Sequence, residues 1–269
     1  MVKVKIYDCI TFFDENLITN ARFEILNNIV DFFVICESRF DHKGLKKKIN
    51  FKLLNKKFEK KIRHIIIDEN FPNLSDGWKV EEYQREKLFK GLEDAQSDDL
   101  IMYSDSDEIP NPDILKNINL KKKFGIFMQK FFVYKLNIFN KFETPWEGTR
   151  ICRRKNLKSF TYLRKKVLKK NINKSFWKVY IEKDIQIINK GGWHFNNLYN
   201  PETISKKLMT FQHQEFSKSE FSSVNIIKNK IKKLQDLFNR GYVFKVVKLD
   251  KSFPRYILKN KKKFLKWVQ

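Results

Sequence analysis

Three carboxylates lie within four residues at the end of an apolar stretch. Asp105, Asp107 and Glu108 follow the run 100–103, and Pro110 then turns the chain away. Grouped carboxylates are unfavourable unless a cation neutralises them, and Mg²⁺ or Mn²⁺ prefers such hard oxygen ligands. Two carboxylates cannot fill an octahedral shell, so substrate phosphates and water would complete it. A metal bridging a diphosphate would stabilise charge on a leaving group, as sugar transfer from a nucleotide requires.

Two other interpretations of this acidic cluster are open. The aspartates could belong to a solvated loop and cap the next helix. The cluster could also serve a metal-dependent nucleotide or phosphoester hydrolase, which would release nucleotide or phosphate without an acceptor. The chain has no Gly-rich phosphate-binding loop, which argues against the P-loop class.

A second cluster is Gly191-Gly192-Trp193-His194-Phe195. Paired glycines allow a backbone to approach a ligand closely, and Trp193 offers a stacking surface for the donor. His194 could ligate the metal or donate a hydrogen bond to a phosphate. The alternative is a tight turn followed by aromatic core, with a surface histidine.

Further donor contacts are predicted at basic and acidic side chains elsewhere. Arg85 and Arg150 could pair with diphosphate oxygens in bidentate fashion. Asp8 and Glu37, in the first two strand-like stretches, are predicted to join Asp105 in donor binding.

The elements that would position these residues alternate along the first hundred residues. Apolar, β-rich runs predict strands, and helical spacing of apolar residues predicts helices between them. The predicted strands are Val2–Thr11, Val30–Glu37, Ile62–Asp68 and Asp99–Asp105, and the predicted helices are Asp14–Ile29 and 75–95. This alternation predicts an α/β fold, a mostly parallel sheet flanked by helices, with ligands at the carboxyl ends of its strands.

After Pro112 the pattern changes. Strands are predicted in Phe124–Ile138 and Trp177–Phe195, and helices near 201–215 and 223–239. Residues 1–200 should form one core domain, and residues 201–269 a helical extension packed on it. The terminal segment Pro254–Val268 is basic and amphipathic, so it should either pack on the domain or contact an anionic membrane surface.

Composition bounds the class of protein. The 269 residues include 42% hydrophobic residues and carry a formal net charge of +25, so the chain should be globular and could attract polyanions. A nucleic-acid-binding protein is therefore an alternative function. However, the lysines are spread along the whole chain, and no helix-turn-helix, zinc or RNA-binding signature is present, which makes specific nucleic-acid binding the weaker hypothesis.

Cellular location is predicted from the same data. The three cysteines, Cys9, Cys36 and Cys152, form neither a zinc pattern nor a disulfide framework, which fits a reducing compartment. No signal peptide is recognisable at Met1, and no apolar run reaches the roughly 20 residues of a membrane span. We expect a cytoplasmic protein, peripheral on the inner face of a membrane if the basic terminal segment docks there.

Taken together and in order, these stretches resemble glycosyltransferase family 17. The resemblance runs nearly end to end, and its sharpest parts are Ser104–Pro110 and Gly191–Phe195. The other matching stretches are Asp14–Leu26, Val30–Ser38 with Gly44 and Phe51, Asp76–Trp78, Arg85, Asp98–Ile101 and Pro254–Asn260.

The resemblance implies a GT-A type fold and an inverting transferase that uses a nucleotide-sugar donor, UDP-N-acetylglucosamine in the best-known member. On the matched positions, Asp105 and Asp107 would hold the metal, with His194 as a further metal or phosphate contact. Unlike the animal enzymes, this chain shows no membrane anchor or disulfide-bearing context. Residues 120–185 have little that matches, so the glycan acceptor stays open.

Inversion requires a general base that accepts the proton of the attacking hydroxyl. Glu108, Glu147 and Asp184 qualify by residue type. Glu147 is preferred because it lies beside Trp146 and Gly148 in a loop-like stretch that could line a sugar site, and Glu108 is the second catalytic candidate. The alternative for each is a solvated carboxylate.

Overall fold

The computed structural model describes residues 3–72, 76–210 and 219–269. Ser75, at the predicted start of the second helix, and residues 211–215 of the predicted helix 201–215 lie outside the described residues. Within the described part, no helix has the length and apolar character needed to cross a membrane.

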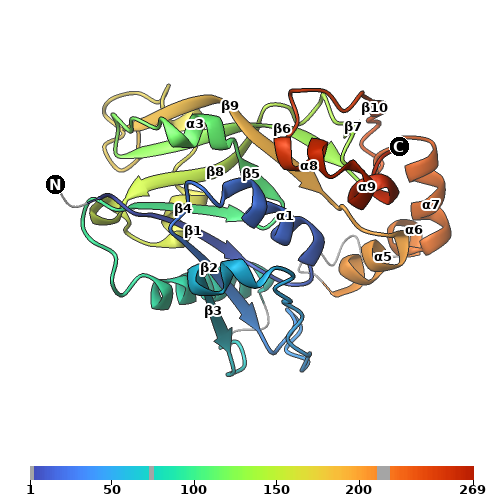
Figure 1. Cartoon of the computed structure of the whole chain (residues 1–269), viewed down its shortest axis with the longest axis horizontal. Helices are drawn as coiled ribbons and strands as arrows, with labels where there is room; N and C mark the ends of the chain where they lie inside the picture. The colour runs from blue at the N-terminus through green and yellow to red at the C-terminus, as the bar shows by residue number, and fades with distance from the viewer. Residues whose placement is uncertain (1–2, 73–75, 211–218) are drawn as a thin grey trace.

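The amino-terminal half is a parallel sheet in the strand order β3-β2-β1-β4 (Figure 1). Each predicted strand is present, shortened at one or both ends or shifted by one or two residues: β1 (Ile6–Thr11), β2 (Phe32–Ser38), β3 (Ile62–Ile67) and β4 (Leu100–Asp105). The helices between them are α1 (Asn16–Leu26) and α2 (Gly77–Glu86), which continues as a 3-10 helix (Lys87–Gly91). The α/β fold class predicted from the alternation is confirmed.

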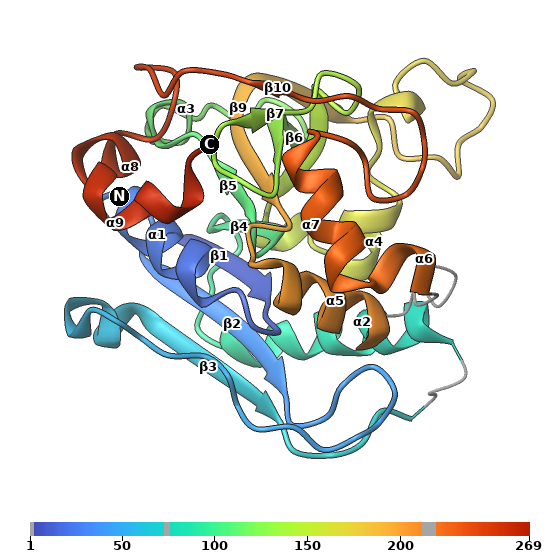
Figure 2. The same cartoon turned by 90° about the vertical axis from the view of Figure 1, so that its right-hand side faces the viewer.

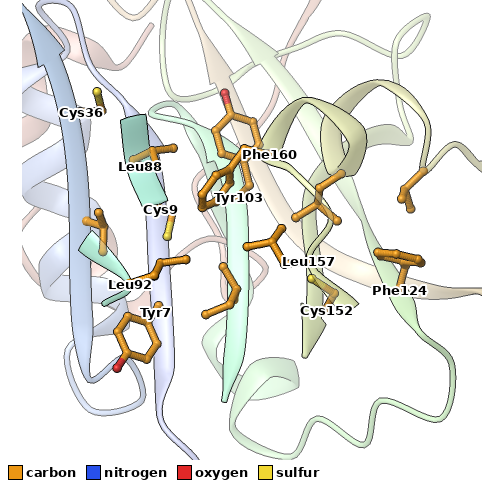
Figure 3. Close-up of a cluster of buried hydrophobic side chains, with 14 of the residues drawn as sticks. Tyr7, Cys9, Cys36, Leu88, Leu92, Tyr103, Phe124, Cys152, Leu157 and Phe160 are labelled. Atoms are coloured by element: carbon orange, nitrogen blue, oxygen red, sulfur yellow. The ribbon is translucent and has the colours of Figure 1, made fainter. Parts of the chain in front are cut away.

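Both faces of this half-sheet are covered, which explains its nearly continuous apolar strands. One face, bearing Tyr7 and Cys9, packs against Leu88 and Leu92. Figure 3 shows this cluster extending across the sheet to Cys152. The opposite face, bearing residues such as Ile10 and Phe33, packs against α1 through Phe23 and Leu26.

The second half of the sheet is mixed. β8 (Trp146–Arg153) joins β4 antiparallel and also pairs with β6 (Phe124–Val133), which runs parallel to β9 (Ile185–Asn196). The remaining strands are β5 (Glu108–Pro110), β7 (Ile138–Phe139) and β10 (Lys245–Val246). The predicted stretch Trp177–Phe195 thus holds a single strand that begins at Ile185, and the predicted Phe124–Ile138 strand ends at Val133.

Short helices complete this half: α3 (Pro112–Lys116) and α4 (Phe160–Lys165), with 3-10 helices at Lys56–Lys61, Arg154–Asn156 and Lys169–Asn171. The carboxyl-terminal helices are α5 (Pro201–Thr210), α6 (Ser219–Ser222), α7 (Val224–Lys232), α8 (Arg255–Lys259) and α9 (Lys261–Phe264), followed by a 3-10 helix (Leu265–Trp267). The predicted helix 223–239 therefore ends at Lys232.

The carboxyl-terminal segment is joined closely to the rest of the chain. β10 pairs antiparallel with β7, so this segment is not purely helical. Ile257 of α8 and Phe264 of α9 are buried in one cluster with Phe132 and Trp193, and α8 lies beside α1 (Figure 1). Burial of this apolar surface packs the described residues 245–268 onto the rest of the sheet.

Candidate active site

A cleft of about 950 Å³ opens where β1 and β4 end. Thr11, the last residue of β1, and Asp105, the last residue of β4, both line it. Its other walls come from α2, α4 and α5, which Figure 2 shows grouped on the same side of the sheet. The cleft therefore has the position expected of a ligand site in an α/β sheet.

The acidic cluster forms the turn between β4 and β5. This turn brings Asp105, Ser106 and Asp107 to the cleft wall. β5 pairs antiparallel with β9, with Glu108 opposite His194. This register brings His194 to the cleft as well, with its Nε2 3.3 Å from Oδ1 of Asp107. The three residues predicted as metal ligands thus line one cleft, although 87 positions separate Asp107 from His194 in sequence.

The His194 ring is held by aromatic neighbours and by Asp107. Its centroid lies 4.3 Å from that of Phe131 and 5.1 Å from that of Trp146. Burial lowers the pKa of His194, but the charge of Asp107 and their hydrogen bond outweigh it and raise that pKa above its usual value. Burial likewise raises the pKa of Asp107, and the same partner lowers it overall. The buried Nδ1 atom has no hydrogen-bond partner among the described residues.

Arg164 of α4 neutralises the other two carboxylates of the cluster. It forms an ion pair with Asp105 and donates to both oxygens of Glu108, at 2.9 and 3.1 Å. Trp146 Nε1 donates to Glu108 Oε1 at 2.7 Å. Burial raises the pKa of Asp105 to about 6, because the charge of Arg164 offsets burial only in part. Burial also raises the pKa of Glu108, but the charge of Arg164 and its hydrogen bonds outweigh burial there and lower that pKa.

Glu108 is therefore corrected from catalytic candidate to buried anion. Its side chain is 0% exposed and does not line the cleft, and both of its oxygens are hydrogen-bonded. An acceptor hydroxyl cannot reach it in this arrangement. Its contacts instead hold the turn between β4 and β5.

Arg22 of α1 is a positioning residue that the sequence analysis did not single out. It is fully buried, and it donates to both oxygens of Asp8, to Ser104 Oγ and to the carbonyl oxygen of Glu108, each at 2.6 Å. Its only sequence signal was its position, which is on the same side of the predicted helix as the apolar residues Ile18 and Ile25. Asp8, predicted to bind the donor, is 1% exposed and fully engaged by Arg22. Its role is corrected to positioning the acidic turn from beneath.

Glu37, another predicted donor contact, also lies outside the cleft. Glu37 is buried and accepts from Lys47 Nζ and from the backbone N–H groups of Asn50 and Phe51, so it fixes the segment after β2. Burial raises its pKa, but these hydrogen bonds, together with the His64 ring 3.3 Å away, outweigh burial and lower it.

Arg150 and Glu147 form a local pair at the start of β8. Arg150 is 3% exposed, donates to the carbonyl oxygens of Glu147 and Gly148, and has its pKa lowered to about 10 by burial. The Glu147 carboxylate accepts from the backbone N–H of Lys169 at 3.0 Å. Neither side chain lines the cleft, so both are structural contacts here, and the preferred general-base candidate is not at the site.

The paired glycines serve backbone packing. A Cβ at Gly192, whose φ is +133°, would overlap the carbonyl oxygen of Ile109, and one at Gly191 would lie 2.7 Å from Met128 N. Trp193 is 6% exposed and donates its indole N–H to the carbonyl oxygen of Ser252 at 2.9 Å. The predicted ligand approach at the glycines and the stacking by Trp193 are therefore replaced by close packing of β9 on β5 and β6.

Arg85 does line the cleft, as predicted. It is 5% exposed and donates from Nε to the hydroxyl of Tyr103 at 2.9 Å and from Nη2 to Glu81. Burial opposes its charge, but Tyr103 and Glu81 raise its pKa. Its buried Nη1 atom has no hydrogen-bond partner among the described residues, so one donor of this cleft-lining guanidinium is unsatisfied.

Within the part of the chain that the structure describes, cations from four separate segments line the same cleft as the acidic turn. Those lining the cleft are Arg85, Arg164, Lys165, Lys166, Lys207 and Arg240. Most were not predicted, because nothing in the sequence distinguishes them from the other members of a set of 56 basic residues. Together they can bind the phosphates of a nucleotide.

The protein offers few ligands to a metal. Within residues 3–72, 76–210 and 219–269, no three His, Cys, Asp or Glu side chains are grouped so as to hold an ion. Asp105 and Asp107 could supply two oxygen ligands, and substrate phosphates and water would have to supply the others. That donor set fits Mg²⁺ or Mn²⁺ bound together with a diphosphate.

Two solved glycosyltransferase structures share parts of this architecture at low similarity. Glucosyl-3-phosphoglycerate synthase from Mycobacterium tuberculosis, solved with Mn²⁺, UDP and glucosyl-3-phosphoglycerate, is 11% identical, with a TM-score of 0.37 over 77% of this chain and 76% of that one. A glycosyltransferase involved in glycosylation of the major capsid of PBCV-1 is 10% identical, with a TM-score of 0.32 over 69% and 81%.

Sequence similarity to curated proteins is confined to part of the chain. The human and rat beta-1,4-mannosyl-glycoprotein 4-beta-N-acetylglucosaminyltransferases are each 34% identical to it over 105 residues, or 35% of this chain. The match spans about one fifth of the length of those relatives, 20% and 19%. The model of glycosyltransferase family 17, by contrast, matches residues 1–265, and the chain therefore belongs to that family.

Proposed function

We propose that this protein is an inverting glycosyltransferase that moves N-acetylglucosamine from UDP-N-acetylglucosamine to a glycan acceptor with the help of Mn²⁺ or Mg²⁺. The observation that carries the proposal is the cleft whose wall holds both Asp105 and Asp107 together with several basic side chains. Family membership supports the sugar transfer. The name of the curated relatives supports the choice of donor sugar.

In this proposal Asp105 and Asp107 hold the metal, which stabilises negative charge on the departing diphosphate. Arg85 contributes its unpaired Nη1 to a phosphate oxygen. His194 fixes the orientation of the Asp107 carboxylate through their 3.3 Å contact. Arg164 keeps the Asp105 carboxylate from being repelled by Glu108. These residues bind and orient the donor before the acceptor attacks.

A base must still accept the acceptor's proton. With Glu108 and Glu147 outside the cleft, the carboxylates left along its wall among the described residues, apart from the aspartates of the acidic turn, are Glu15 and Glu81. Glu15 accepts from the backbone N–H groups of Phe13 and Asp14, whereas Glu81 pairs with Arg85. The base is to be sought between these two by separate Gln substitutions.

The first test is a thermal-shift screen of nucleotides and nucleotide sugars with and without Mn²⁺. A donor present at a hundred times its Kd stabilises the folded state by about 2.7 kcal/mol. Asp107→Asn should abolish the metal-dependent shift and sugar transfer while the protein stays folded. Asp113→Asn is the matched control, because Asp113 pairs with exposed Arg255 and does not line the cleft.

The outcomes separate the functions under consideration. A shift with UDP-N-acetylglucosamine that requires Mn²⁺ and is lost in Asp107→Asn supports the transferase. Full transfer by Asp107→Asn contradicts the metal site. Release of UDP at the same rate with and without any glycan acceptor would point to a hydrolase. No shift with any nucleotide sugar would overturn the proposal and favour nucleic-acid binding.

A further inference from the structure

Residues 172–180, which we term the aromatic loop, place large apolar side chains in water. Every residue of this loop is exposed. The exposed fractions are 70% for Phe176, 72% for Trp177, 87% for Val179 and 79% for Tyr180. Clustered exposed apolar side chains of this kind mark an interaction surface, whereas single ones do not.

The aromatic loop folds on itself and adds little to the core. The backbone N–H of Lys178 donates to the carbonyl oxygen of Ser175, and that of Val179 to the carbonyl oxygen of Trp177. The rings of Phe176 and Trp177 lie 3.6 Å apart, centroid to centroid. The loop is thus a turned structure that presents its apolar side chains outward.

Charge identifies the kind of partner. Residues 172–180 contain Lys174 and Lys178 and no acidic residue, and Lys169 and Lys170 precede the loop. Aromatic rings with a polar edge settle at the boundary between lipid headgroups and acyl chains. Lysines interleaved with such rings add attraction to anionic headgroups. We propose that the aromatic loop docks this protein on an anionic lipid surface.

The position of the loop gives this docking a consequence for the cleft. Leu168, four residues before the loop, lines the cleft wall, and Figure 2 shows the chain leaving α4 and extending away from the body of the protein. Docking would therefore bring one wall of the cleft to the lipid surface. If the proposed sugar transfer holds, an acceptor carried on a lipid would be within reach there. The docking itself does not depend on that function.

The carboxyl-terminal segment, predicted from sequence as an alternative membrane contact, is less suited to this role. Ile257 and Phe264 are buried, and Trp267 packs against the same cluster. Among its apolar side chains, Leu265 is the one exposed to a large extent, at 68%. Its apolar face is thus occupied by the protein itself.

The test measures co-sedimentation of the full chain with two kinds of vesicle, phosphatidylcholine alone and phosphatidylcholine with about 30% phosphatidylglycerol. The anionic lipid gives the second kind a negative surface potential, which attracts basic segments. The triple variant Phe176→Ser, Trp177→Ser, Tyr180→Ser keeps all charges. We expect it to bind the anionic vesicles at least about tenfold more weakly, since three apolar side chains lose their burial. Its thermal unfolding should match the wild type, because these side chains are exposed.

Two control variants change exposed leucines outside the aromatic loop. Leu54 is 72% exposed in a distant segment and Leu265 is 68% exposed in the carboxyl-terminal one. Leu54→Ser and Leu265→Ser should each bind like the wild type. As a second measurement, Trp177→Phe should keep binding but lose most of the blue shift in tryptophan fluorescence that vesicles induce.

Three results would overturn the proposal. The first is no binding of the wild type to anionic vesicles. The second is equal binding by the triple variant, which would mean that the high net charge alone attracts lipid. The third is loss of binding in Leu265→Ser with the triple variant unaffected, which would move the contact to the carboxyl-terminal segment. Vesicle binding is measured without any sugar donor. Its outcome is therefore independent of whether the protein transfers a sugar.

Discussion

Removing the Arg22 guanidinium should destabilise the whole protein, because it leaves a buried charge without a partner. Arg22 is 0% exposed and Asp8 is 1% exposed. Arg22→Met would leave the Asp8 carboxylate unpaired and would also remove the donors to Ser104 Oγ and the Glu108 carbonyl oxygen. Breaking a buried ion pair from one side costs about 3–5 kcal/mol. Since a typical domain has about 5–15 kcal/mol of stability, this loss would be large.

A double-mutant cycle isolates the interaction. Asp8→Asn keeps the shape of the side chain and should cost about 3 kcal/mol, because the buried guanidinium then lacks its counter-charge. The double variant should lose about 1–3 kcal/mol less than the two single losses added together, since neither charge remains. Lys57→Met, which removes the half-exposed partner of Glu24, is the control and should cost less than about 1 kcal/mol.

The assay is urea unfolding at pH 7, followed by tryptophan fluorescence, with donor binding measured in parallel. If Asp8 touched the donor, as its place in the first strand had indicated, Asp8→Asn would weaken donor binding and leave stability unchanged. That pattern, or a loss of less than about 1 kcal/mol in Arg22→Met, would refute the positioning role.

Three more predictions address the strand register, pH and catalysis. Gly192→Ala should cost about 3 kcal/mol or more in thermal or urea unfolding, because its Cβ meets the backbone of Ile109 at a positive φ; unchanged stability would contradict this. Burial raises the pKa of Asp236, but hydrogen bonds from Arg240 outweigh burial and lower that pKa. The Asp236 carboxylate therefore stabilises the fold above about pH 4, and this stabilisation is lost as pH falls through the lowered pKa. Asp236→Asn should therefore cost about 1–3 kcal/mol at pH 6 and progressively less below pH 4; an equal difference at both pH values would argue against it. Glu147→Gln should keep transfer within about threefold of the wild type by initial-rate assay, a change of about 0.7 kcal/mol in barrier, because its carboxylate lies outside the cleft; a hundredfold loss would restore it as the base.

Local patterns in the sequence predicted much of the fold. A strand covered on both faces is apolar throughout, and a helix repeats its apolar residues every three to four positions. Both signals are visible in short windows, so β1 to β4 and α1 were each anticipated within a few residues. The second helix was also anticipated, but α2 ends at Glu86 and its 3-10 continuation at Gly91, short of the predicted end at Ala95. The acidic turn after β4 was also predicted, because the strand and the carboxylates adjoin in the chain.

The mixed half of the sheet was less predictable. Apolar content in Trp177–Phe195 indicated strands, but residues 177–184 lie outside any strand and include part of the exposed aromatic loop. Aromatic residues have the same local preference whether they face a core or a partner surface. Only the packing of the whole chain decides whether such residues are buried in a strand or exposed in a loop.

The identity of the cleft residues depended on the sequence in part and on the tertiary structure for the rest. The order of motifs was sufficient to place Asp105, Asp107 and His194 in one site, and the β5–β9 pairing brings them together. Contacts between residues far apart in the chain decide which cations line the cleft with these residues. Such contacts also pair Asp8, Glu37 and Arg150 with neighbouring groups, so these side chains are not open to a ligand. The spacing of apolar residues along a sequence indicates which side of a helix or strand is buried. It does not indicate which other helix or strand packs against that side. The partners of each buried charge were therefore decided by the tertiary structure alone.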